Sequence, residues 1–172
     1  MVVGMVRAAA AVAFRGAERA AVIGARRRRM TAPSSNVTQA VPFFWVRDIE
    51  ASIRFYKEGL GFVLTNAWID DGKRRWCWLE LGGAAVMLQE FWMDGPHRNL
   101  PDRALGVGVG IYFTCQDAIA IYRELKARGL TPQRPFVGNG MWVTHIADPD
   151  GYALYFESKT DAPEESELAE EG

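Results

Sequence analysis

An alternating run of side chains after a Pro-Asp-Gly turn predicts the best-defined strand of the chain. The stretch from Ala147 to Ser158 reads ADPDGYALYFES. Side chains in a strand alternate between two faces, so the run divides into two rows. One row is apolar and contains Tyr152, Leu154 and Phe156, and the other contains Ala153, Tyr155 and Glu157. We expect the apolar row to pack beneath helices and the mixed aromatic and acidic row to meet a ligand.

The hydrophobic pattern predicts the order strand, helix and three strands in the first half of the chain. Residues 40–46 alternate as a first strand, and their proline at position 42 suits an edge strand. Asp48 is placed to cap a helix and Gly59 to end it. Turn residues then separate three further strands, expected at 62–69, 74–81 and 84–91.

The same order is predicted again in the second half of the chain. A strand at 110–115 precedes a helix that Asp117 caps and Gly129 ends, and short strands are expected at 133–137, 141–146 and 152–157. Asp48 and Asp117 are 69 residues apart, and Gly59 and Gly129 are 70 apart. This regular spacing indicates an internal duplication.

The pattern outside the repeats sets the expected boundaries. Residues 1–38 are read as an N-terminal extension and linker, either dispensable, with the functional chain starting near Met30, or similar to an Arg-rich organelle transit peptide. The folded domain is expected at 39–158, with one module at 39–92, a linker at 93–106 and a second module at 107–158. Residues 159–172 are acidic and are predicted to form a disordered tail.

Composition and charge narrow the classes of partner. The chain of 172 residues is 49% hydrophobic and 24% charged, which suits one buried core. Its net charge of −1 combines a basic extension at +6, a middle part at −2 and a tail at −5. The middle part has no basic stripe and the chain has no long apolar run, so we expect neither nucleic acid nor a membrane as partner. Cys77 and Cys115 lie in strand-like runs and are expected to be free thiols, as in a cytoplasmic protein.

Three stretches carry a resemblance to a known family. They are AVPFFWVRDIEASIRFYKEGLGF at Ala40 to Phe62, the FTCQD-helix-RGL stretch, and ADPDGYALYFES. They resemble the vicinal oxygen chelate superfamily of glyoxalase I, extradiol dioxygenases, fosfomycin-modifying enzymes and bleomycin-resistance proteins, over roughly residues 39 to 158. The resemblance implies an α+β fold, in which two tandem βαβββ modules form a curled mixed sheet cup with helices outside.

The resemblance also implies where a catalytic metal would be held. Catalytic members bind a divalent ion through four side chains, usually His or Gln and Glu, from the first and last strands of both modules. The corresponding positions here are Val41, Leu88, Gly110 and Tyr155. Three of these side chains have no donor atom and a neutral phenol is a poor ligand, so we predict no metal, no cofactor and no catalytic residue.

A shifted metal site is the alternative to this prediction. Glu90 and Glu157 share side-chain parity with Leu88 and Tyr155, and His145 is nearby in sequence. A lyase or dioxygenase-like enzyme could use such a set. We expect instead that His145 is a hydrogen-bonded strand histidine and that the other histidine, His97, is exposed to solvent.

Strand parity predicts an aromatic lining for the cup. The candidate ligand-binding residues are Phe43, Trp45, Trp78, Leu88, Glu90, Gly110, Tyr112, Trp142, Tyr155 and Glu157, with Trp76 and Thr114 as further members of the same rows. Aromatic walls with a few carboxylates suit a planar or cationic molecule, although the same aromatics could fill a core or a dimer interface.

This lining is similar to that of the metal-free bleomycin-resistance branch, which sequesters a drug without transforming it. The Ala-Val-Pro opening at Ala40 to Pro42 fits that branch, in which the first strand crosses to a partner subunit. The resemblance implies a homodimer with ligand grooves between subunits. Two hypotheses therefore stand, a small-molecule binding protein that confers resistance and a metal-dependent enzyme with a shifted site.

Overall fold

The structure is a computed structural model that describes residues 36–93 and 95–169. Contacts divide the chain into the units Met1–Ala40 and Val41–Gly172. Most of the predicted extension, and with it the question of a transit peptide, lies outside the described residues. Every strand and helix described below belongs to the second unit. Together they form two successive βαβββ modules, as the sequence predicts.

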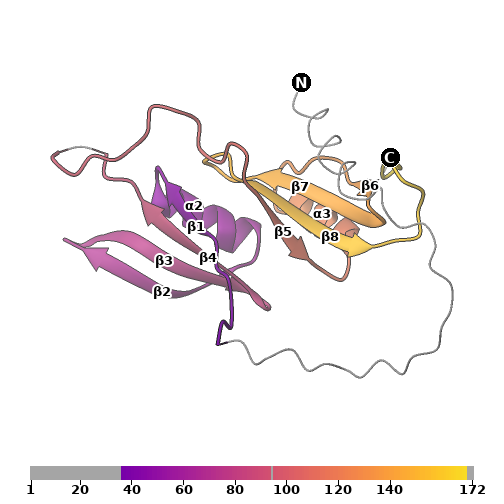
Figure 1. Ribbon diagram of the computed structural model, residues 1–172, viewed down its shortest axis with the longest axis horizontal. Coiled ribbons are helices and arrows are strands. Elements are labelled where there is room, and N and C mark those ends of the chain that lie inside the picture. The colour runs from indigo at the N-terminus through magenta and orange to yellow at the C-terminus, as the bar shows by residue number, and fades with distance from the viewer. Residues whose placement is uncertain (1–35, 94, 170–172) are drawn as a thin grey trace. The chain divides into compact units, whose positions relative to one another are not determined.

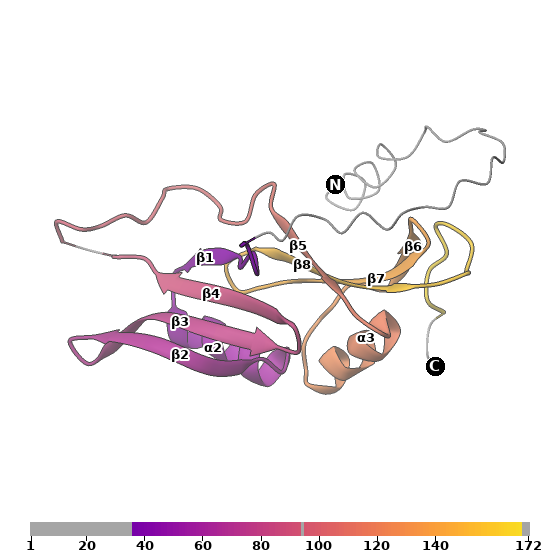
Figure 2. The same ribbon diagram turned by 60° about the horizontal axis from the view of Figure 1, so that its bottom comes forward.

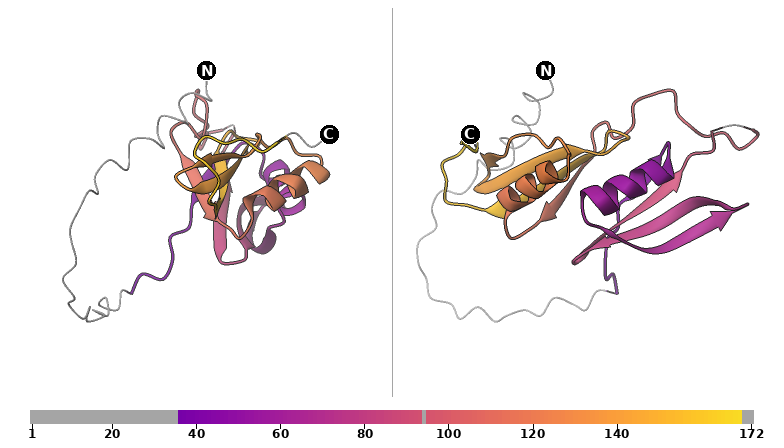
Figure 3. Two further views of the ribbon diagram at one scale, coloured as in Figure 1. Left: turned by 90° about the vertical axis from the view of Figure 1, so that its right-hand side faces the viewer. Right: turned by 180° about the vertical axis from the view of Figure 1, so that it is seen from behind.

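The first module is a four-stranded mixed sheet, called sheet A, with strand order β1-β4-β3-β2 (Figure 1). Its strands are β1 (Phe43–Val46), β2 (Val63–Asp70), β3 (Lys73–Leu81) and β4 (Ala84–Glu90). β1 pairs with β4 in parallel, and the other pairs are antiparallel. Helix α2 (Ile49–Arg54) continues into the π-helical turn η1 (Phe55–Gly59), and together they cover one face of the sheet (Figure 3).

The second module repeats this arrangement as sheet B, with strand order β5-β8-β7-β6. Its strands are β5 (Gly110–Thr114), β6 (Phe136–Gly138), β7 (Met141–Ala147) and β8 (Ala153–Lys159). The parallel pair is β5 with β8. Helix α3 (Ala118–Ala127) covers one face of this sheet (Figure 2).

Both helices begin where the sequence places their caps. The Asp48 carboxylate accepts hydrogen bonds from the backbone N–H groups of Glu50 and Ala51, each at 3.0 Å. The Asp117 carboxylate accepts one from Ala120 at 2.9 Å. These bonds satisfy donors that have no partner within the helix, which confirms the predicted starts.

The buried core lies on the helix-covered faces of the sheets. Leu79 and Leu88 of sheet A are fully buried, and Leu154 and Phe156 of sheet B belong to the same cluster. This arrangement confirms that the apolar row of the last strand is sealed. The opposite side of each sheet, which no helix among residues 36–93 and 95–169 covers, is called its open face below.

The Pro-Asp-Gly turn of the second module is hydrogen-bonded to the first module. Tyr56 donates its hydroxyl proton to Asp148 at 3.2 Å, and Arg47 donates to Asp150 at 3.0 Å. Tyr152 stacks on Phe44 with 4.2 Å between ring centroids. Its hydroxyl donates to the backbone oxygen of Trp45 at 3.0 Å. The turn therefore joins the two repeats as well as connecting two strands.

The acidic C-terminal segment differs from the prediction of a disordered tail. β8 extends to Lys159, and the segment beyond it pairs with β6 through a bridge between Phe136 and Glu167. The Glu164 carboxylate accepts hydrogen bonds from the N–H groups of Asn139 and Gly140, at 3.0 and 2.6 Å. These two residues have positive φ angles of 55° and 68°, as an Asn-Gly hairpin turn requires. Backbone hydrogen bonds of Val137 with Glu165 and Ser166, together with the Glu164 contacts, hold this acidic segment in place.

Among the described residues, no helix has the length and apolar character needed to span a membrane. Cys77 and Cys115 are free, and Cys77 is fully buried.

Candidate functional site

The open face of sheet A carries five aromatic side chains. Strand register places Phe43 and Trp45 opposite Met87 and Gln89, which in turn lie opposite Trp78 and Trp76. Trp68 on β2 lies opposite Trp76 and completes the row. Phe43 and Trp68 keep 44% and 46% of their surface exposed, so the face still offers rings for stacking.

One indole of this face is held by a carboxylate. Trp78 donates its Nε1 proton to Glu80 Oε1 at 2.8 Å. Glu80 is exposed and lies two residues along the same strand, on the same side as the indole. It therefore adds a negative charge at the border of an otherwise uncharged aromatic surface.

The open face of sheet B carries a column of three stacked rings. Tyr112 and Tyr155 stack with 4.5 Å between centroids and 10° between planes, and His145 stacks on the other side of Tyr155 at 4.6 Å and 22°. Tyr112 is 56% exposed and ends the column toward solvent. Thr114 and Glu157 pair next to it in the same register.

Gly110 leaves the space in which Tyr155 lies. A Cβ atom built at Gly110 would be 2.9 Å from the Tyr155 ring. The absence of a side chain on β5 therefore allows the ring to lie against the strand. Two of the predicted metal-ligand positions, Gly110 and Tyr155, are thus filled by one aromatic ring.

Burial keeps the groups of this column uncharged. Partial burial lowers the pKa of His145, and both of its ring nitrogens are buried without a hydrogen-bond partner. The predicted hydrogen bond of His145 is therefore not formed with any described residue of the chain. Burial also raises the pKa values of Tyr112 and Tyr155, so both phenols stay protonated at neutral pH. Glu157 contributes the single carboxylate next to these rings.

The predicted orientation of Leu88 and Glu90 is wrong. Leu88 pairs with Phe44 and is fully buried on the helix-covered face. Glu90 is 4% exposed on that same face, where Lys73 and Arg75 form ion pairs with it at 2.6 and 2.9 Å. The open face of β4 instead carries Met87 and Gln89. The Met87 thioether is a soft ligand, which divalent ions that prefer oxygen ligands do not favour.

Trp142 also lies on the helix-covered side. It pairs with Ser158, whose hydroxyl accepts a hydrogen bond from the N-terminal N–H of α3 at 3.0 Å. Trp142 is therefore not part of the open face of sheet B. His97 is exposed, as expected, and lies 6.3 Å from Trp92 between ring centroids.

The residues at the expected metal positions do not form a metal site. Val41, Leu88 and Gly110 supply no side-chain donor, and the described residues contain no group of three His, Cys, Asp or Glu side chains that could hold a metal ion. Glu90 faces away from the open faces, so the shifted set of Glu90, Glu157 and His145 does not come together.

Comparisons with known proteins place this geometry in a family. Residues 37–156 match the Glyoxalase/Bleomycin resistance protein/Dioxygenase superfamily. The chain belongs to this superfamily. A search of curated proteins finds no match.

Solved structures of the superfamily fold are similar to this chain at low identity. One is TnmS3, an antibiotic binding protein from Streptomyces sp. CB03234, with a TM-score of 0.54, 22% identity and coverage of 74% of this chain and 100% of that one. Another is a bleomycin-binding protein in complex with bleomycin, with a TM-score of 0.54, 21% identity and coverage of 72% and 99%. TioX from Micromonospora sp. ML1 has a TM-score of 0.58, 16% identity and coverage of 72% and 99%. These similarities show that the glyoxalase/bleomycin-resistance fold predicted from the sequence is correct.

Proposed function

We propose that this chain binds a planar aromatic or cationic small molecule on its open faces and sequesters it without transforming it. The observation that carries the proposal is the column of Tyr112, Tyr155 and His145, whose outer ring is more than half exposed. A flat ligand can extend such a column by stacking. Glu157 and Glu80 supply negative charge for a cationic group beside the rings.

The lack of charged catalytic groups and metal donors on the described parts of these faces favours binding over catalysis. The phenols and the imidazole are held neutral, and the donors needed for a divalent ion do not gather on either face. The similar structures include two whose names describe antibiotic or bleomycin binding, which supports the same class of ligand. We place this binding in the cytoplasm, where the free thiols Cys77 and Cys115 would stay reduced.

A second copy of the chain would complete the site. Large apolar side chains with substantial exposure lie on the open faces of both sheets, including Phe43, Trp68 and Tyr112. Packing two copies through these faces would place the aromatic row of sheet A against the column of sheet B and bury both. The proposed assembly is therefore a homodimer with a ligand groove between subunits.

Titration of tryptophan fluorescence tests the binding. Bleomycin and a panel of planar organic cations serve as probes, because four of the six tryptophans lie on the open face of sheet A. We expect saturable quenching by at least one probe. Substitution Tyr112→Ala should weaken that affinity about tenfold, since one lost stacking or cation–π contact amounts to roughly 1 kcal/mol.

Trp142→Phe is the matched control. It replaces an indole on the helix-covered side with a smaller ring and should leave the affinity unchanged. Failure of every probe to alter the fluorescence, or equal weakening by both substitutions in folded protein, would count against binding at the open faces.

A further inference from the structure

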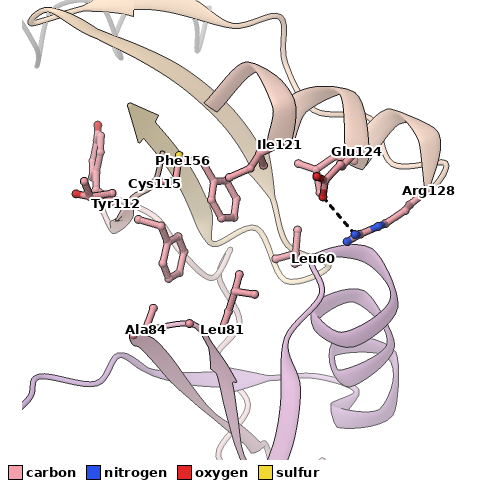
Figure 4. A pocket seen from close by; sticks show the side chains of 14 residues that line it. Leu60, Leu81, Ala84, Tyr112, Cys115, Ile121, Glu124, Arg128 and Phe156 are labelled. Carbon is pink, nitrogen blue, oxygen red and sulfur yellow. Dashed lines mark hydrogen bonds and ion pairs between the residues drawn. The ribbon is translucent and has the colours of Figure 1, made fainter. Parts of the chain in front are cut away.

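A cavity of about 540 Å³ lies between the turn that joins β3 to β4, strand β5 and helix α3, with Tyr112 of the aromatic column at its border (Figure 4). Its walls are mainly apolar and include Leu60, Leu81, Phe113, Ile121, Leu125 and Phe156. Five parts of the chain therefore surround one space, namely Leu60, the β3–β4 turn, β5, α3 and Phe156 of β8. Pockets that hold small organic molecules have volumes of about 300 to 1,000 Å³, so this space is large enough for such a ligand.

The cavity lies on the side of β5 opposite the column. Phe113 and Phe156 stack in the core at 5.1 Å, whereas Tyr112 and Tyr155 stack on the open face. Tyr112 borders the cavity as well, but its ring points away from Leu81 and Ile121 (Figure 4). Apart from Tyr112 and Thr114, which border both, a molecule in the cavity would therefore contact different side chains from one on the open faces.

The charged groups at the cavity compensate each other. Arg128 donates to Glu124 at 3.3 Å and to the backbone oxygen of Gly59 at 3.0 Å. The pair brings no net charge to the cavity. An anionic ligand that bound Arg128 in place of Glu124 would leave the Glu124 carboxylate without its partner. We propose that the cavity is a second binding site and takes an uncharged, predominantly apolar small molecule, whose apolar surface the leucine, isoleucine and phenylalanine side chains would cover.

Cys115 provides a reporter inside this site. Its thiol lines the cavity and donates to the backbone oxygen of Glu157 at 3.4 Å. The only other thiol, Cys77, is fully buried in the core of the first module. Reaction of the folded protein with a disulfide reagent should therefore report access to the cavity, and the substitution Cys115→Ser should abolish the rapid phase.

The experiment uses N-phenyl-1-naphthylamine, an uncharged probe that becomes fluorescent in apolar surroundings. We expect saturable fluorescence with wild-type protein and, over the same concentrations, slowing of the Cys115 reaction by about tenfold. Leu81→Trp places an indole in the cavity and should weaken probe binding by about tenfold or more. The control Ile69→Trp adds the same side chain at an exposed position of β2 that does not line the cavity and should bind the probe like wild type.

Three results would overturn the second site. One is probe binding that leaves the Cys115 reaction rate unchanged. Another is a folded Leu81→Trp protein, checked by its thermal unfolding transition, that binds the probe as tightly as Ile69→Trp does. The third is protection of Cys115 that rises with protein concentration in the absence of probe, which would show that a second copy covers the cavity. Stacking of the aromatic probe on the open faces would raise the fluorescence but would neither slow the Cys115 reaction nor be weakened by Leu81→Trp. Failure at the cavity is therefore distinguishable from failure of the proposed function, which the Tyr112→Ala titration tests.

Discussion

At the scale of single residues, the fold places Asp148 where the charged form of its carboxyl group is disfavoured. It is 5% exposed, and burial raises its pKa to about 6, although the N–H groups of Asp150 and Tyr152 donate to its carboxylate. The folded chain therefore binds a proton at this carboxyl more tightly than the unfolded chain, whose pKa is about 3.9. As pH rises from about 4 to about 6, folded protein loses stability from this group, and above about pH 6 the loss is complete.

Asp148→Asn tests this linkage. The amide oxygen can still accept from the two N–H groups, and the amide nitrogen can donate to the Tyr56 hydroxyl in place of the bond that Asp148 now receives. The variant removes the cost of burying a charge, so we expect it to gain stability over wild type at about pH 8. The shift of roughly two pKa units corresponds to a gain on the order of 3 kcal/mol, which should shrink toward zero at about pH 4. Denaturant unfolding at both pH values measures the difference. Asp102→Asn, in an exposed loop, is the control, and a gain that is the same at both pH values would contradict the assignment.

The orientation of single residues was the least predictable part of the candidate site. Tyr155 and Glu157 lie on the predicted face because Leu154 and Phe156 mark the opposite side of β8, and Tyr112 lies opposite Tyr155 on β5. Leu88 was misplaced because β4 begins with the run AAVML, which is apolar on both sides and gives no alternation. Trp68 and His145 lacked any local signal, since their place beside other rings depends on pairing with β3 and β8.

At the scale of elements, caps and turns made most of the fold predictable. Asp48 and Asp117 give a chemical reason for a helix to begin, and Asp71-Gly72 and Asn139-Gly140 supply the positive φ angles that tight hairpins need. The acidic composition of the C-terminal segment predicts a disordered tail, but the structure shows the segment bound to β6 and its turn. Its acids are not only solvated, because Glu164 meets the free amides of the turn between β6 and β7.

Glu164→Ala should release the C-terminal segment. The substitution removes the acceptor for two backbone N–H groups, so we expect faster cleavage of the segment after residue 160 in limited proteolysis, with the rest of the domain intact. The matched control is Asp161→Ala, which removes an exposed acid from the same segment but not from that turn. Equal cleavage rates for the two variants would show that the contacts of Glu164 do not hold the segment.

At the scale of the whole molecule, the open faces are the surfaces through which we expect the protein to bind its ligand and a second copy of itself. The exposed aromatic side chains Phe43, Trp68 and Tyr112 lie there, and a homodimer through these faces is the proposed consequence. Trp68→Glu places a charge in that surface, so we expect the variant to elute as a monomer in size-exclusion chromatography with light scattering. Ala127→Glu adds a charge at an exposed position of α3 and should leave the dimer intact. A monomeric wild-type protein would contradict the assembly.

The position of the Tyr155 ring against Gly110 also limits how this chain could change. A chelating residue introduced at position 110 would need its first side-chain carbon where the tyrosine ring now lies. That ring would have to leave both the phenol and the imidazole between which it is packed. Conversion of this scaffold into a metal-dependent catalyst therefore requires coordinated replacement of at least two neighbouring residues, and each replacement alone would lose the existing packing before any new chemistry is gained.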